Sequence, residues 1–272
     1  MKSNRRKFIS SAAAGISSAS IALTLGKFNH LNAQQANQSE NKSPYGPLKP
    51  TADLTSGLSL LKLPEGFSYQ TFGWTGEVMS DGRKTPSSHD GMGIIDDRDG
   101  VFTLCRNHER GGLIDSFADP KNTYDSKAPG GTTNLVFDGG AGKFISSRAS
   151  LSGTIRNCAG VVTPWGTWLT CEETTLGTEE TSDPQHEKTH GWIFEVPASG
   201  QGIPQPLKAM GRFVHEAIAV DPLTSFVYET EDRGTSGLYR FRPNTKENLH
   251  NGGTLEMLRV PEHPDLSKGV KP

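Results

Sequence analysis

Carboxylate, imidazole and thiol side chains recur in three stretches of the chain, each time at the ends of paired apolar segments. In the second stretch, Cys171, Glu172 and Glu173 close an apolar run that begins at Thr167. Thiolate and imidazole ligands suit transition metals, whereas carboxylate oxygens suit Ca²⁺ or Mg²⁺. This segment therefore predicts a mixed metal site. The alternative is an exposed acidic loop beside a buried cysteine.

The other two stretches carry similar residues in matching places. They are His89, Asp90, Asn107, His108 and Glu109 in the first stretch, and His215, Glu216, Glu229, Glu231 and Asp232 in the third. Like charges that lie close together repel one another, and bound cations would offset that repulsion. The alternative is that the carboxylates form salt bridges with neighbouring arginines, such as Arg212 and Arg240.

Three arginines, Arg106, Arg156 and Arg233, lie next to these candidate ligands in the sequence. A guanidinium group donates paired hydrogen bonds to a phosphate, so arginines beside a metal site suit phosphate binding. The commoner role of such arginines is to pair with acidic side chains, and the sequence alone leaves both roles open.

Each stretch is predicted to form an antiparallel β-hairpin, because two apolar, β-branched or aromatic segments flank a turn. The turns are Asp99-Gly100, Pro164-Trp165-Gly166 and Asp221-Pro222. In a hairpin, the start of the first strand lies beside the end of the second. The polar residues of each stretch are therefore expected to meet.

A further strand is expected after each hairpin, at residues 133–137, 192–196 and 238–241. Three or four strands per repeat predict an all-β fold of the β-propeller class, in which equivalent strand ends converge on a central channel. The sequence contains about three blades and the start of a fourth at residues 254–258, whereas propellers have about four to eight blades. We therefore expect an incomplete propeller. A β-sandwich is the structural alternative.

The N-terminus predicts export. Residues 4–10 contain paired arginines followed by Phe8, and residues 12–25 are mildly apolar, which is typical of a twin-arginine signal. An ordinary secretory signal or a short membrane anchor is the alternative. Because the twin-arginine machinery exports folded proteins, often with a cofactor already inserted, we expect a periplasmic or extracellular metalloprotein. The predicted organisation is a signal peptide at 1–33, a flexible linker at 34–57 and the N-terminal part of a propeller domain at 58–272.

The composition argues against nucleic-acid binding and does not decide whether the cysteines are paired. The net charge is −2 and no basic cluster follows the signal, which argues against nucleic-acid binding. Nothing after the signal predicts a membrane span. The three cysteines, Cys105, Cys158 and Cys171, cannot all pair with one another. A disulfide between Cys105 and Cys158 and burial as free thiols are both open.

Four segments resemble the PhoX-type alkaline phosphatases, and the resemblance runs from about Leu58 to the end. The segments are Arg106-Asn107-His108-Glu109, the run from Asn157-Cys158-Ala159-Gly160 through Trp168 to Cys171-Glu172-Glu173, Val214-His215-Glu216, and Tyr228-Glu229-Thr230-Glu231-Asp232-Arg233. Val161 stands where the family pattern has a second glycine. Family members are also much longer, and their later blades supply further metal ligands and basic residues.

The resemblance implies a secreted β-propeller phosphatase that holds iron and calcium and hydrolyses phosphate monoesters. It implies Cys171 as the iron ligand. The matching carboxylates are Glu172, Glu173, Glu216, Glu231 and Asp232, and further metal candidates in matching motifs are Asn107, Glu109 and His215. The catalytic candidates are Asn157, Arg156 and Arg233.

Two other functions are compatible with the sequence. One is another propeller hydrolase, such as a calcium-dependent lactonase, and iron content would count against it. The other is a catalytically silent, metal-stabilised propeller fragment that needs a separately encoded C-terminal half.

Overall fold

The computed structural model describes residues 43–177 and 186–261, and the predicted signal peptide lies outside them. The chain divides into two compact units, residues 1–72 and 73–272. In the described residues of the first unit, strands β1 (Lys49–Ala52) and β2 (Ser59–Leu63) form a hairpin. The linker prediction is therefore wrong for residues 49–52. The physical reason is the buried Asp53, whose carboxylate accepts hydrogen bonds from Ser56 N and Thr71 N and so fixes the turn.

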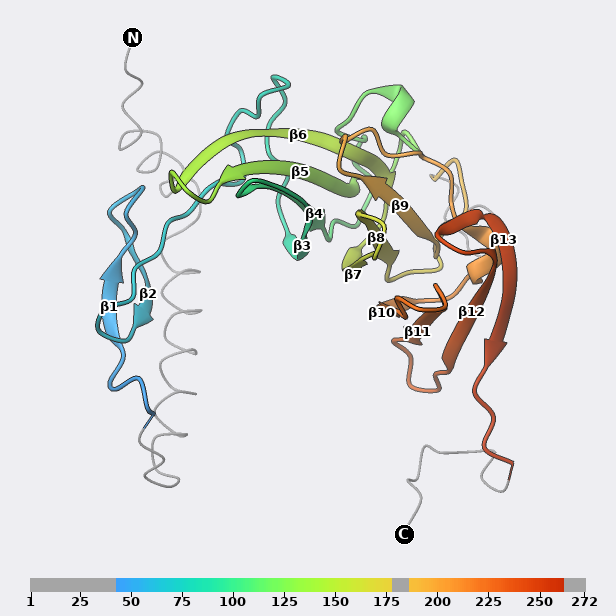
Figure 1. Cartoon of the computed structure of the whole chain (residues 1–272). Helices are drawn as coiled ribbons and strands as arrows, with labels where there is room; N and C mark the ends of the chain where they lie inside the picture. Colours follow the sequence, from blue (N-terminus) through green and yellow to red (C-terminus); the bar gives the residue numbers. More distant parts are fainter. Residues whose placement is uncertain (1–42, 178–185, 262–272) are drawn as a thin grey trace. The chain divides into compact units, whose positions relative to one another are not determined.

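Antiparallel sheets make up the second unit (Figure 1). The first sheet contains β3 (His89–Arg98), β4 (Val101–His108), β5 (Gly130–Asp138) and β6 (Lys143–Thr154) in sequence order. The second contains β7 (Asn157–Val162), β8 (Thr167–Glu172) and β9 (Ile193–Pro197). The third contains β10 (His215–Val220), β11 (Val227–Glu231), β12 (Leu238–Thr245) and β13 (Asn248–Met257). Two short 3₁₀ turns, η1 (Pro120–Asn122) and η2 (Lys208–Met210), lie in the connections.

The first strands of the three sheets lie side by side, β3 against β7 and β7 against β10. One apolar cluster, which includes Leu169 and Phe241, joins the second sheet to the third, and another, which includes Leu151 and Phe194, joins the first to the second. Sequential meander sheets packed through their first strands are the arrangement of propeller blades. The predicted all-β propeller class is confirmed. The segment expected to start a fourth blade belongs instead to β13, the last strand of the third sheet.

A β-bulge interrupts the first strand of each of the three sheets at the same place. In the first sheet, His89 pairs with His108 and Met92 with Arg106, so three steps along β3 match two along β4. The same one-residue excess falls between residues 157 and 160 in β7 and between 215 and 218 in β10. A bulge re-aims the side chains beside it. Each of the three hairpins predicted from the sequence therefore also carries a β-bulge at the same position in its first strand.

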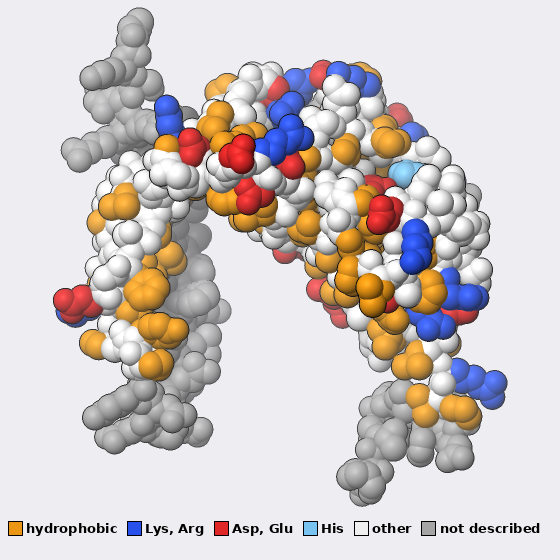
Figure 2. Space-filling model, viewed as in Figure 1, with side chains coloured by type: hydrophobic (Ala, Val, Ile, Leu, Met, Phe, Trp, Pro, Cys, Tyr) orange, Lys and Arg blue, Asp and Glu red, His pale blue; other side chains and the backbone are white. Residues whose placement is uncertain are grey.

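The bulge of the first sheet lies close to the second sheet. Gly91, in the first bulge, is so near β7 that an added Cβ atom would lie 2.8 Å from the carbonyl oxygen of Cys158. A larger residue at position 91 would therefore push β3 and β7 apart. On the face drawn in Figure 2, acidic and basic side chains are interspersed. Within residues 43–177 and 186–261, no helix has the length and hydrophobicity needed to cross a membrane.

Candidate metal centre

A thiol and two carboxylates meet where the three sheets converge. The ligand atoms of Cys158, Glu173 and Glu216 all lie within 4.8 Å of one another. Cys158 and Glu216 are the bulge residues of β7 and β10, and Glu173 directly follows β8. The bulges thus turn two side chains of neighbouring sheets toward a common point.

Three more carboxyl groups adjoin this group. The carboxyl group of Glu109 lies near those of Asp90 and Glu173, and that of Glu173 lies near Asp232, so that a proton could be shared within each pair. Each sheet therefore supplies one bulge residue and the residue that follows its second strand. The resulting candidate ligand set, called the ligand set below, is Asp90 and Glu109 from the first sheet, Cys158 and Glu173 from the second, and Glu216 and Asp232 from the third.

The clustered carboxyl groups of the ligand set favour bound cations. Burial, followed by the charge of Glu216, raises the pKa of Glu173 to about 7. Burial and the nearby Asp90 likewise raise the pKa of Glu109. Carboxylates in mutual contact cannot all ionise unless a positive charge lies among them. The donor set, one sulfur with five carboxyl groups, fits a transition metal beside a hard cation such as Ca²⁺.

Two arginines share a cavity with the ligand set. Arg156 and Arg233 line a cavity of about 420 Å³ together with Glu173 and Asp232. Arg233 donates a hydrogen bond of 3.3 Å to Thr175 Oγ1. Among the described residues, neither arginine has a carboxylate oxygen within 4.0 Å. Both guanidinium groups therefore keep donors for an anion in this cavity.

Cys171 lies outside the donor group, which corrects its prediction as the iron ligand. Its side chain is fully buried in the apolar cluster between the second and third sheets. Burial raises its pKa well above the ordinary value of a thiol. Cys158, which precedes it in the hairpin, supplies the thiol instead. All three cysteines are free, so Cys105 and Cys158 are not paired.

Three other predicted site residues use their polar atoms for hydrogen bonds that hold the fold together. Glu172 accepts hydrogen bonds from the backbone N–H groups of Ile155, Gly191 and Trp192 and from His190 Nδ1. The amide of Asn107 donates to Cys158 O and Ala159 O, and its oxygen accepts from Trp168 Nε1 and Thr170 Oγ1. Asn157 accepts from Thr154 Oγ1 and donates to Thr170 Oγ1. Because their polar atoms make these hydrogen bonds, the three side chains connect neighbouring strands and are not part of the ligand set.

His215 and Glu231 start and end the third hairpin but also face away from the ligand set. His215 is fully buried, with Nδ1 3.5 Å from Glu229 Oε2, and burial lowers its pKa to about 4. The carboxylate of Glu231 accepts hydrogen bonds from Gly237 N and Tyr239 Oη. Of the predicted metal ligands, the structure therefore brings together Glu109, Glu173, Glu216 and Asp232.

The buried ion pair behind the site gives a pH-dependent stability. His190 lies between Glu172 Oε1 at 2.7 Å and Asp125 Oδ2 at 3.3 Å. Burial opposes its protonation, but these carboxylates outweigh burial and raise its pKa from 6.5 to about 9. A raised pKa stabilises the fold fully below the unfolded value, and that stabilisation is lost as the pH rises through the folded value. We expect the free energy of unfolding to fall by about 3 kcal/mol between pH 6.5 and 9.

Chemical denaturation at a series of pH values would measure this loss. His190→Gln should flatten the pH dependence over the same interval, because glutamine carries no titrating proton. An unchanged slope in the variant would assign the pH dependence to other groups.

The family model of alkaline phosphatase PhoX matches residues 43–150 and 142–270. The chain belongs to the PhoX family. A solved structure of Pseudomonas fluorescens PhoX in complex with vanadate, a transition state analogue, is similar with a TM-score of 0.45 and 18% identity. The match covers 68% of this chain and 50% of that one, so the chain spans about half the length of this PhoX relative. No curated protein sequence matches the chain.

Proposed function

We propose that this PhoX-family chain is a metal-dependent phosphatase that hydrolyses phosphate monoesters outside the cytoplasm. One observation carries the proposal: Glu173 and Asp232 belong to the ligand set and line the same cavity as Arg156 and Arg233. A phosphate in this cavity would contact guanidinium donors on one side and metal ligands on the other. That juxtaposition is the one that phosphoryl transfer requires.

Six residues would hold the metals. Cys158 would bind a transition metal, which we propose to be iron, together with Glu173 and Glu216. The carboxyl groups of Asp90, Glu109 and Asp232 suit calcium. When bound, the metals supply Lewis-acid chemistry to the phosphoryl group.

The chain's own residues would bind and orient the substrate. Arg156 and Arg233 would donate hydrogen bonds to the phosphoryl oxygens and offset the charge that develops on them. Arg156 has a φ of 50°, an uncommon value for a residue other than glycine. Its backbone N–H donates to Arg110 O and its carbonyl accepts from Glu173 N. These bonds fix Arg156 beside the ligand set.

Export from the cytoplasm is inferred from the sequence pattern of the N-terminus. It depends on the twin-arginine pattern at residues 4–10, which lie outside the described residues. A folded metal centre is the kind of cargo that this route carries. Peptide sequencing of the mature N-terminus from a periplasmic or culture fraction would test both the route and the predicted cleavage after residue 33.

Replacing either arginine should lower phosphatase activity strongly. Arg156→Gln and Arg233→Gln each remove a donor to the developing charge, and such donors are worth about 10²-fold in rate. Hydrolysis of p-nitrophenyl phosphate by the metal-loaded chain would measure the loss in kcat/KM. Arg98→Gln is the matched control, because Arg98 pairs with Asp96 at the far end of β3.

A metal-loaded chain without phosphatase activity would contradict the proposal and favour the catalytically silent alternative. Activity that survives EGTA would remove calcium from the mechanism. Activity toward lactones in a chain that binds calcium but no iron would favour the lactonase alternative.

A further inference from the structure

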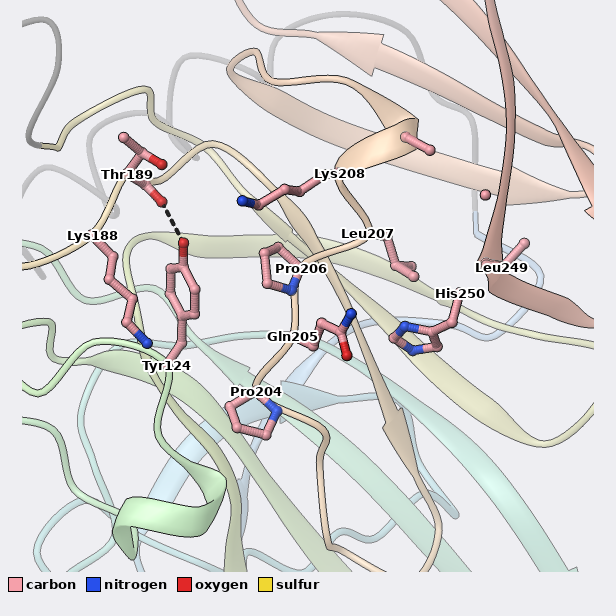
Figure 3. Close-up of a pocket in the computed structure, with 12 residues that line it drawn as sticks. Tyr124, Lys188, Thr189, Pro204, Gln205, Pro206, Leu207, Lys208, Leu249 and His250 are labelled. Atoms are coloured by element: carbon pink, nitrogen blue, oxygen red, sulfur yellow. Dashed lines mark hydrogen bonds between the residues drawn. The ribbon is translucent and has the colours of Figure 1, made fainter.

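A second cavity, separate from the metal centre, has a volume of about 650 Å³. It is lined by Tyr124, by Lys188 and Thr189 ahead of β9, by residues 204–209 after β9, and by Leu249, His250 and Gly252 of β13 (Figure 3). None of these residues lines the arginine cavity or belongs to the ligand set. Its size falls in the range of small-molecule sites, roughly 300–1,000 Å³.

The charge of this second cavity is opposite to that of the metal centre. Its described lining includes two lysines and a histidine but no aspartate or glutamate. Among the described residues, neither Lys188 nor Lys208 has a carboxylate oxygen within 4.0 Å. His250 Nε2 lies 3.6 Å from Glu195 Oε2, outside the lining. The charge of the lining therefore favours an anion over a cation as the ligand.

Aromatic rings hold the two lysines in place without using their donors. Lys188 Nζ lies 4.6 Å from the centre of the Tyr124 ring, and Lys208 Nζ lies 5.8 Å from that of Trp192. Such cation–π contacts are electrostatic, so the N–H groups of each ammonium stay available for hydrogen bonds. The Tyr124 hydroxyl is itself fixed by a 2.9 Å hydrogen bond to Thr189 O. In the view of Figure 3, the Tyr124 ring stands between the two lysine side chains.

The remaining wall combines polar groups, Thr189 and Gln205, with the apolar rings of two prolines. Pro204 and Pro206 lie along the cavity (Figure 3), whereas Leu207 and Leu249 are only 3% and 1% exposed and add little surface. A free inorganic anion would leave this surface uncovered. An organic anion with a flat or apolar body would cover it and place its charged group near the lysines.

We propose that this cavity binds an organic anion, a phosphate or carboxylate that carries an apolar or aromatic body. The site is independent of the metal centre and of the phosphatase activity. It shares the phosphate-binding chemistry of the arginine cavity, but its described lining contains no carboxylate or thiol to hold a metal cluster, so it would bind such a molecule without hydrolysing it.

Calorimetric titration of the full chain with phenylphosphonate and with benzoate tests the proposal. The titrations use the Arg156→Gln, Arg233→Gln double variant, so that the arginine cavity does not contribute. We expect saturable binding that weakens with salt. Lys188→Gln and Lys208→Gln should each reduce the affinity about 10-fold, the value of one charged hydrogen bond.

Two further variants separate the site from general charge effects. Lys188→Arg should retain binding because it keeps the cation over Tyr124, and Lys143→Gln on β6 should leave it unchanged. Tighter binding of phenylphosphonate would assign the site to phosphates, and tighter binding of benzoate to carboxylates. Failure of both probes to bind, or equal affinity in the two Lys→Gln variants and the parent, would overturn the proposal.

Discussion

Cys158→Ala is expected to abolish transition-metal binding, whereas Cys171→Ala leaves it intact. Only Cys158 has its sulfur within 4.8 Å of the carboxylate oxygens of Glu173 and Glu216. Cys171 packs in the apolar cluster between the sheets. Since loss of a residue that merely supports a metal ligand already costs about 10–100-fold in affinity, loss of the ligand should cost at least about 100-fold.

The two alanine variants form a matched pair, because both remove a buried thiol from the same cluster. Competition with a chromophoric chelator would measure metal affinity, and thiolate-to-metal absorption would report the sulfur ligand directly. Burial raises the pKa of Cys158 to about 12, so a metal must displace its proton, and affinity should rise with pH. Loss of the absorption band in Cys171→Ala alone would restore Cys171 as the ligand.

Glu172→Gln is expected to cause the largest loss of stability among single carboxylate changes. The carboxylate is fully buried and accepts hydrogen bonds from three backbone N–H groups and from His190. Removing its charge leaves the imidazolium of His190 with Asp125 as its remaining buried partner. Breaking a buried pair in this way costs about 3–5 kcal/mol.

Urea unfolding would measure the change, with Glu256→Gln as the control. Glu256 also accepts charged hydrogen bonds, from Arg240, but on the exposed face of β12 and β13. We expect the control to leave the unfolding midpoint nearly unchanged, because exposed ion pairs contribute little. If the urea unfolding midpoint of Glu172→Gln is as close to that of the parent protein as the midpoint of Glu256→Gln is, Glu172 does not hold the sheets together.

The hairpins were predictable because their turns and apolar runs are local features of the sequence. That locality placed Glu109, Glu173, Glu216 and Asp232 at converging strand ends, where the structure has them. The bulges were not predictable in the same way, since a one-residue excess depends on how two strands pair. The family resemblance implied Cys171 as the iron ligand, whereas the bulge in β7 places Cys158 beside Glu173 and Glu216.

The residues missed by sequence reasoning do carry a signal. Asp90 and Cys158 each stand second in their first strand, after His89 and Asn157, as the predicted Glu216 does after His215. Comparing the repeats position by position would have grouped them. Comparing the repeats would not have revealed the structural roles of Glu172 and Asn107. Their hydrogen-bond partners, such as Ile155 N and Cys158 O, are backbone groups, which every residue type supplies.

The repeated bulge has a consequence for how the ligand set tolerates change. The three bulge positions hold an aspartate, a cysteine and a glutamate, so residues of different chemistry occupy one geometry. Deleting one residue at a bulge would restore regular pairing and turn the ligand to the opposite face of its strand. A substitution at a bulge would therefore change the metal preference of its sheet, whereas a one-residue deletion would remove the ligand of that sheet from the centre. Gaps in this part of the chain are a sharper sign of a lost metal centre than changes of residue type.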